Sequence, residues 1–83
     1  MLVTGKNLYL NLDAAHGQAR VALLRAGKVI PGFGIEECEP VVGSSARAIV
    51  RWKTGDLAKL KGEKISLRIE MKDAGLYSVW TDD

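Results

Sequence analysis

Apolar and polar residues alternate with a period of two over most of the chain, as in β-strands that bury one face and expose the other. Residues 7–13 carry leucine at every second position. The alternation is clearest over residues 64–72. The residues expected to face inward there are Ile65, Leu67, Ile69 and Met71. These segments predict a sheet with one wet side.

Less regular apolar runs predict further strands. We expect them at residues 18–24, 28–30, 46–52 and 76–80. Between them, Ala26-Gly27 predicts a tight hairpin and His16-Gly17 another turn. In the turn over residues 73–75, Gly75 is expected to supply the positive φ. Turn residues that separate short strands predict a sandwich or a small barrel rather than a βαβ unit.

Two segments depart from the alternation. Residues 56–62 predict one helical turn, with Asp56 as its N-cap, Leu57 and Leu60 inward and Gly62 at its end. Residues 32–45 contain glycine, proline and an acidic cluster, and we expect a loop that crosses between two sheets. The fold class is therefore all-β: a small antiparallel, jelly-roll-like β-sandwich with one short helical turn, forming a single domain over residues 1–83.

Composition removes several classes of function. The chain has 83 residues, room for one core, and its net charge of +2 comes from interleaved charges without the basic run of a nucleic-acid arm. One cysteine and one histidine build neither a disulfide nor a closed zinc site. No stretch is apolar enough to span a membrane or to act as a signal peptide. We expect no nucleic-acid partner, no membrane partner and no cofactor, and the compartment stays open.

Candidate catalytic groups are sparse. His16 is expected on a surface turn, and the glutamates beside Cys38 disfavour its thiolate. Four acidic residues could pair for glycoside hydrolysis or ligate calcium, although their spacing is not that of a calcium loop; they are Glu36, Glu37, Glu39 and Asp56. The weak calcium candidates are Glu36, Glu37 and Glu39. A solvated acidic loop or a contact to a partner domain is the preferred interpretation, and we expect no enzymatic activity.

Binding chemistry is better represented. Trp52 follows the alternation into the core, whereas Tyr9 falls on the polar face of its strand and Trp80 lies near the C-terminus. Tyr9 and Trp80 are therefore the candidates for an exposed aromatic platform that stacks against sugar rings. Arg47 and Arg51 are expected on one face of a strand, where they could bind an anion or an acidic partner. The alternative is a solvated face whose arginines pair with Glu63 and Glu70.

An ordered set of short motifs spans nearly the whole chain. It consists of residues 6–13 (KNLYLNLD), 17–21 (GQARV), 30–33 (IPGF), 37–43 (ECEPVVG), 50–53 (VRWK), 56–57 (DL), 60–65 (LKGEKI) and 74–78 (AGLYS). This order resembles the C-terminal β-sandwich appended to bacterial glycosidase-like and sialidase-like propeller proteins. The chain departs from that pattern where Ser44 follows Gly43 in place of an aspartate.

The resemblance implies an accessory module that packs on, or extends, a carbohydrate-active domain, in a family that is often secreted. Catalytic residues would belong to the parent propeller, so the implied partners are that parent domain and a glycan. The expected function is a non-catalytic scaffold or a weak glycan binder. The alternative is a stand-alone interaction protein that self-associates, through sheet edges or an apolar face, into a homo-oligomer.

Overall fold

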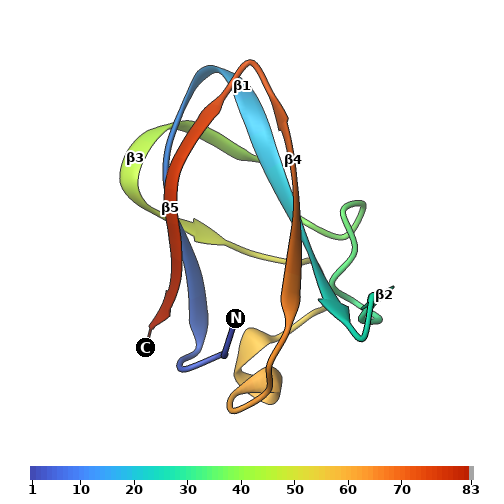
Figure 1. The fold of residues 1–83 in the computed structure, drawn as a ribbon. Coiled ribbons are helices and arrows are strands. Elements are labelled where there is room, and N and C mark those ends of the chain that lie inside the picture. The colour runs from blue at the N-terminus through green and yellow to red at the C-terminus, as the bar shows by residue number, and fades with distance from the viewer. Residues whose placement is uncertain (83) are drawn as a thin grey trace.

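The computed structural model describes residues 1–82 and confirms the all-β, sandwich-like prediction (Figure 1). The elements are β1 (Asn7–Arg25), β2 (Lys28–Val29), β3 (Val41–Val50), the 3₁₀-helix η1 (Leu57–Leu60), β4 (Ser66–Lys72) and β5 (Gly75–Asp82). Every strand pairing is antiparallel. In this part of the chain, no helix is long and apolar enough to cross a membrane.

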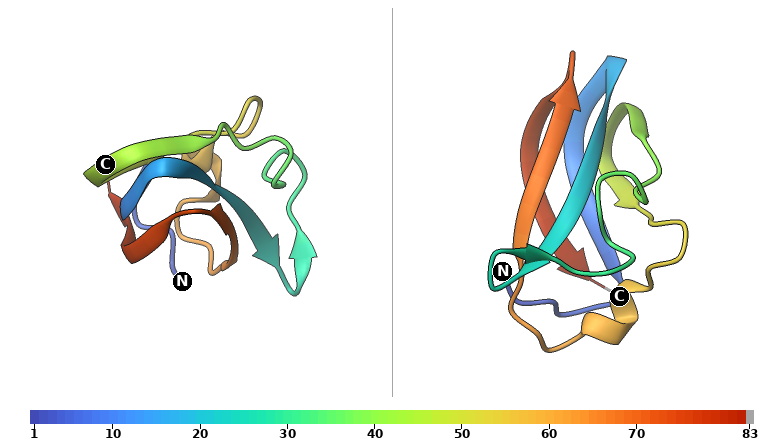
Figure 2. Two further views of the ribbon diagram at one scale, coloured as in Figure 1. Left: turned by 90° about the horizontal axis from the view of Figure 1, so that it is seen from above. Right: turned by 90° about the vertical axis from the view of Figure 1, so that its right-hand side faces the viewer.

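The long strand β1 organises the sheet, because each of the other four strands pairs with it. Its first half lies between β3 on one side and β5 on the other, and its second half pairs with β4 and β2. The ribbon curves so that the two halves face each other (Figure 2). Leu8, Leu10 and Leu12 from the first half join Val21 and Leu23 from the second in one core. Alternate residues along both halves of β1 therefore supply this core, and in the second half Ala22 and Leu24 on the other face are buried as well.

The turn expected at His16-Gly17 is wrong, because β1 continues through these residues as a strand. A Cβ atom on Gly17 would lie 1.8 Å from the Lys72 carbonyl oxygen, which no side chain tolerates. The glycine is needed for close backbone packing where β1 passes the connection between β4 and β5. Without that tertiary contact in view, the same glycine reads as a turn residue.

The other turns follow the predicted chemistry with one exchange. Ala26 and Gly27 have φ of 53° and 80°, as a two-residue hairpin requires, so the predicted hairpin is confirmed. In the turn before β5, the positive φ of 52° falls on Asp73, and Gly75 has no positive φ. Aspartate tolerates this conformation because its short side chain can form local hydrogen bonds.

The predicted helical turn is confirmed as η1. The Asp56 side chain accepts a hydrogen bond from the Ala58 backbone N–H at 3.0 Å, and Leu57 and Leu60 are buried. Gly62 follows with a φ of 90°. The loop expected over residues 32–45 is shorter than predicted, because β3 begins at Val41 and so includes residues 41–45.

The core is closed unevenly. β4 and β5 separate after the turn that joins them, and each pairs with a different half of β1 (Figure 1). Ile65 is buried, whereas Leu67 and Ile69 are half-buried and Met71 is 45% exposed. Met71 shares the face of Leu67 and Ile69, as predicted, but it is not buried there. Within residues 1–82, no strand covers the side chains along this opening.

Candidate functional site

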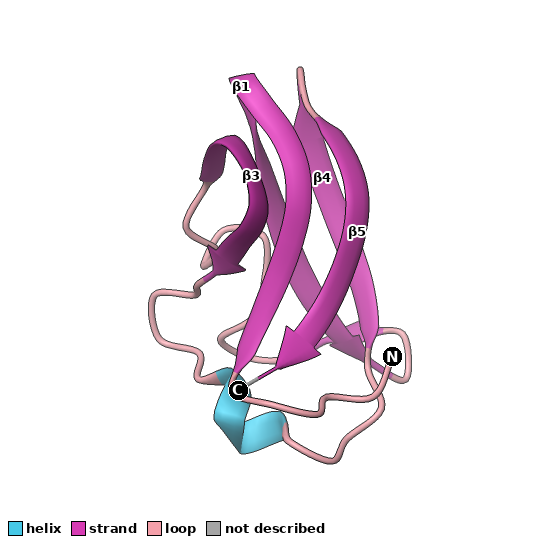
Figure 3. Cartoon of the chain, turned by 90° about the vertical axis from the view of Figure 1, so that its left-hand side faces the viewer, coloured by secondary structure: helices cyan, strands magenta, loops and turns pink. Residues whose placement is uncertain are grey.

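The outer face of the β3–β1–β5 sheet carries most of the predicted binding residues. Leu8, Leu10 and Leu12 point into the core, so the alternate residues of β1 belong to the opposite face. On that face, the cross-strand partners of Tyr9 are Ile49 on β3 and Trp80 on β5. The three strands run side by side in Figure 3. Residues far apart in sequence thus meet around one tyrosine.

Tyr9 contacts Trp80 on β5 and Arg47 on β3. Its ring stacks on Trp80 with 5.6 Å between centroids and an interplanar angle of 25°, and the Arg47 guanidinium lies 4.4 Å from its centroid. A hydrogen bond with the Tyr9 hydroxyl raises the pKa of Arg47. Only 4% of Tyr9 is exposed, so its predicted role as an exposed platform is wrong. Trp80 remains partly exposed and presents the accessible aromatic surface.

Two β-bulges flank Asn11 in the centre of this face. On β3, residues 46–47 lie opposite it between two regular pairs, and on β5 the extra residue is Tyr77, between Leu76 and Ser78. Bulges change the direction in which neighbouring side chains point. Arg47 reaches the Tyr9 ring from one of them, and Tyr77 is 72% exposed at the other. We refer to Tyr9, Asn11, Arg47, Ser78 and Trp80 together as the outer-face cluster.

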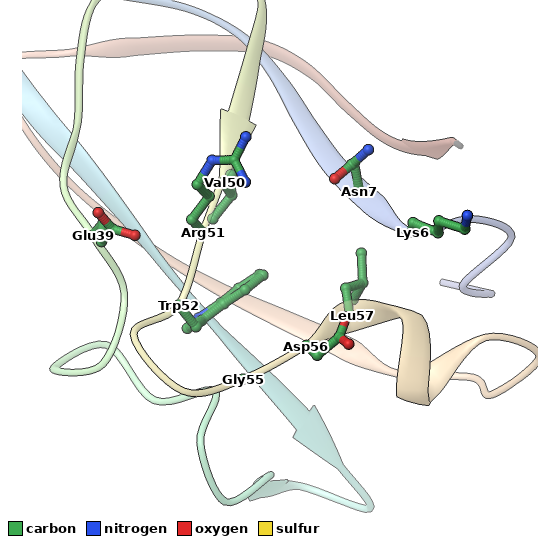
Figure 4. A pocket seen from close by; sticks show the side chains of 9 residues that line it. All are labelled: Lys6, Asn7, Glu39, Val50, Arg51, Trp52, Gly55, Asp56 and Leu57. Carbon is green, nitrogen blue, oxygen red and sulfur yellow. The ribbon is translucent and has the colours of Figure 1, made fainter.

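Arg51 is separated from Arg47, contrary to the prediction of one shared stripe. β3 ends at Val50, and Arg51 lies in the segment that leaves the sheet. There it lines a pocket of about 310 Å³ together with Lys6, Asn7, Glu39, Val50, Trp52, Gly55, Asp56 and Leu57. In Figure 4, Arg51 and Asn7 stand on opposite sides of this pocket, above Trp52 and Leu57. The structure therefore divides the four candidates between the outer-face cluster and this terminal pocket.

The terminal pocket contains residues that sequence reasoning missed. Lys6 and Asn7 lie there because the β1–β3 ladder has its last pair at Leu8 and Val50, beyond which the two segments of the chain diverge. No motif or residue spacing in the sequence indicates a pocket at the end of this ladder. The nearest signal was the N-terminal limit of the alternation at Asn7, which marks the start of β1.

The acidic residues do not gather. Across residues 1–82, no group of three or more His, Cys, Asp or Glu side chains is placed to hold a metal ion, so Glu36, Glu37 and Glu39 form no such site. Glu63 forms an ion pair with Arg25 at 2.6 Å rather than with an arginine of β3. That pair is exposed and contributes little to stability.

Trp52 is in the core, as predicted, and it also completes the backbone hydrogen bonding of β1. Its indole Nε1 donates to the Val21 carbonyl oxygen at 2.9 Å, and the Val21 N–H donates to the Cys38 Sγ at 3.3 Å. Cys38 is fully buried rather than half-buried, and burial raises the pKa of its thiol. His16 is exposed, as expected of a surface residue, although it lies within β1.

Comparison with known proteins adds no relative. No protein-family model matches the chain, and neither a curated protein nor a solved structure matches it significantly. The outer-face cluster and the terminal pocket are therefore the features of the molecule that bear on its function.

Proposed function

We propose that this chain is a non-catalytic accessory β-sandwich module of a carbohydrate-active protein, and that its outer-face cluster contacts a glycan weakly. The observation that carries the proposal is the partly exposed indole of Trp80, fixed by its stack on Tyr9. An aromatic ring offers an apolar surface to the C–H face of a sugar ring. Because the stack on Tyr9 already orders this indole, the Trp80 side chain loses less conformational entropy when a ligand binds.

Polar groups around the indole suit the hydroxyl groups of a sugar. Asn11 and Ser78 are cross-strand partners on the same face, and Asn11 is partly exposed while Ser78 is exposed. An amide both donates and accepts hydrogen bonds, and so does a hydroxyl. Within the outer-face cluster Trp80 is the accessible aromatic, and a single ring supports weak binding, which agrees with an auxiliary role beside a larger domain.

The test is retention on native gels that contain dissolved polysaccharides, both neutral and acidic. Trp80→Ala should migrate as freely in the polysaccharide gel as in the blank gel, whereas Trp80→Phe, which keeps a ring, should retain part of the retardation. Val42→Ala is the matched control, because Val42 is 66% exposed and belongs to β3 outside the outer-face cluster. Equal retardation of the wild type and Trp80→Ala would show that the face does not bind glycan.

A further inference from the structure

We infer that the terminal pocket binds the carboxylate-bearing sugar of an acidic glycan, with Arg51 as the carboxylate ligand; this inference rests on the proposed glycan contact. The pocket exists because strand pairing stops. Beyond the pair of Leu8 and Val50, the segment that contains Lys6 and the segment that leads from β3 to η1 separate. The buried side chains of Trp52 and Leu57 contribute an apolar floor. A volume near 310 Å³ is at the small end for ligand pockets, which are roughly 300–1,000 Å³, and suits a single sugar ring.

Arg51 identifies the charged part of the ligand. Its side chain is exposed, and within residues 1–82 it forms no ion pair with any carboxylate, including those of Glu39 and Asp56 in the same pocket. Arg47, by contrast, is held against Tyr9. A guanidinium presents parallel N–H donors that match the two oxygens of a carboxylate. Lys6, on the rim of the pocket, adds a second positive charge on a flexible stem.

The remaining polar groups favour hydroxyls over a second negative charge. One oxygen of Asp56 accepts the Ala58 N–H, which leaves the other oxygen to accept from a sugar hydroxyl. The Asn7 amide nitrogen donates to the Tyr9 hydroxyl at 3.3 Å, which leaves its carbonyl oxygen as an acceptor. A ligand with one carboxylate and several hydroxyls satisfies both kinds of lining. Inorganic phosphate would place more negative charge beside Asp56 and Glu39.

Asn7 also connects the pocket with the outer-face cluster. It lines the pocket and is hydrogen-bonded to Tyr9, whose ring stacks on Trp80. A glycan whose acidic residue occupies the pocket could therefore extend its next residue along the same face toward the indole. The terminal pocket and the outer-face cluster would then bind consecutive sugars of one glycan.

The experiment is an NMR titration of the ¹⁵N-labelled protein with glucuronate, glucose and acetate in parallel. Glucuronate should shift the backbone amides of residues 6–7 and 51–57, at concentrations at least about tenfold lower than glucose needs. Arg51→Gln should weaken glucuronate binding about tenfold or more because it removes the charged fork. Arg68→Gln, which changes an exposed arginine of β4, should bind as the wild type does.

Glucuronate that binds no better than glucose, or that binds Arg51→Gln unchanged, overturns the inference. Acetate that binds as tightly as glucuronate refutes the sugar part of it. The gel assay separates this failure from that of the proposed function. Loss of retardation in Trp80→Ala without glucuronate shifts at the pocket refutes the inference alone, whereas glucuronate binding at the pocket with full retardation of Trp80→Ala refutes the role of the outer-face cluster alone.

Discussion

The hydrogen bonds around Val21 allow a quantitative test of how β1 is completed. The second half of β1 pairs with β4 along one edge. On its other edge, the ladder with β3 includes Ala19, and the Leu23 N–H donates to the Phe33 carbonyl oxygen. Between these points, the Val21 carbonyl receives the indole of Trp52 in place of a backbone N–H. We therefore expect Trp52→Phe to destabilise the protein by more than the loss of ring size alone.

The magnitude follows from two contributions. Removing the indole N–H leaves the buried Val21 carbonyl without its donor, which costs about 1–3 kcal/mol. The smaller ring buries on the order of 40 Å² less apolar surface, which costs a further ~1 kcal/mol. The sum of about 2–4 kcal/mol compares with a total free energy of unfolding of roughly 4–12 kcal/mol for a domain of this length. Trp52→Phe should thus remain folded at room temperature but with a large part of its stability removed.

The measurement is urea denaturation followed by far-UV circular dichroism, with the fluorescence of the one tryptophan that each variant retains as a second probe. Trp80→Phe is the control, because it makes the same change in ring size at a partly exposed site. It should cost less than about 1 kcal/mol. The reasoning is refuted if the two variants lose equal stability, since the buried hydrogen bond would then contribute nothing beyond ring volume.

Two other features give predictions that need no ligand. Gly17→Ala should prevent stable folding, because its Cβ would overlap the backbone of β4, whereas Gly75→Ala, whose Cβ would meet nothing within 4 Å, should fold normally; comparison of their thermal melts decides this. Asp13 accepts hydrogen bonds from the Ser44 hydroxyl and the Ala15 N–H, and the first of these is the main reason that its pKa lies below the ordinary value. Because the folded pKa is the lower one, this stabilisation is present at neutral pH and is lost as the pH falls below about 4 and through the folded pKa. Between pH 6 and 3 the melting temperature of Asp13→Asn should therefore fall less than that of the wild type, and parallel curves would contradict the assignment.

The strands were predictable because their cause is local. Alternation reports which side chains face the core, and η1 was predicted because Asp56, Leu57 and Gly62 each have a positional role within one turn. Continuity of β1 was not predictable, because Gly17 is explained only by its contact with the distant Lys72 backbone. The start of β3 was missed for a related reason, since residues 41–45 are ordered by pairing with β1 rather than by their own pattern.

The candidate sites divide along the same line. Aromatic and arginine chemistry was visible in the composition, and Arg47, Tyr9 and Trp80 do come together. The burial of Tyr9 was not visible, because it depends on neighbours 38 and 71 positions away in sequence. The terminal pocket could not be predicted at all, because it arises where β1 and β3 stop pairing.

The dependence of every strand on β1 has a consequence for how the protein matures. Asn7 pairs with Asp82, so the first half of β1 lacks one neighbour until β5 has left the ribosome. Pairings of such wide sequence separation form slowly. During that interval the nascent chain exposes an open, leucine-rich strand edge of the kind that recruits other unfinished chains. We therefore expect yield in cells to depend more on the supply of chaperones during synthesis than on the stability of the finished domain.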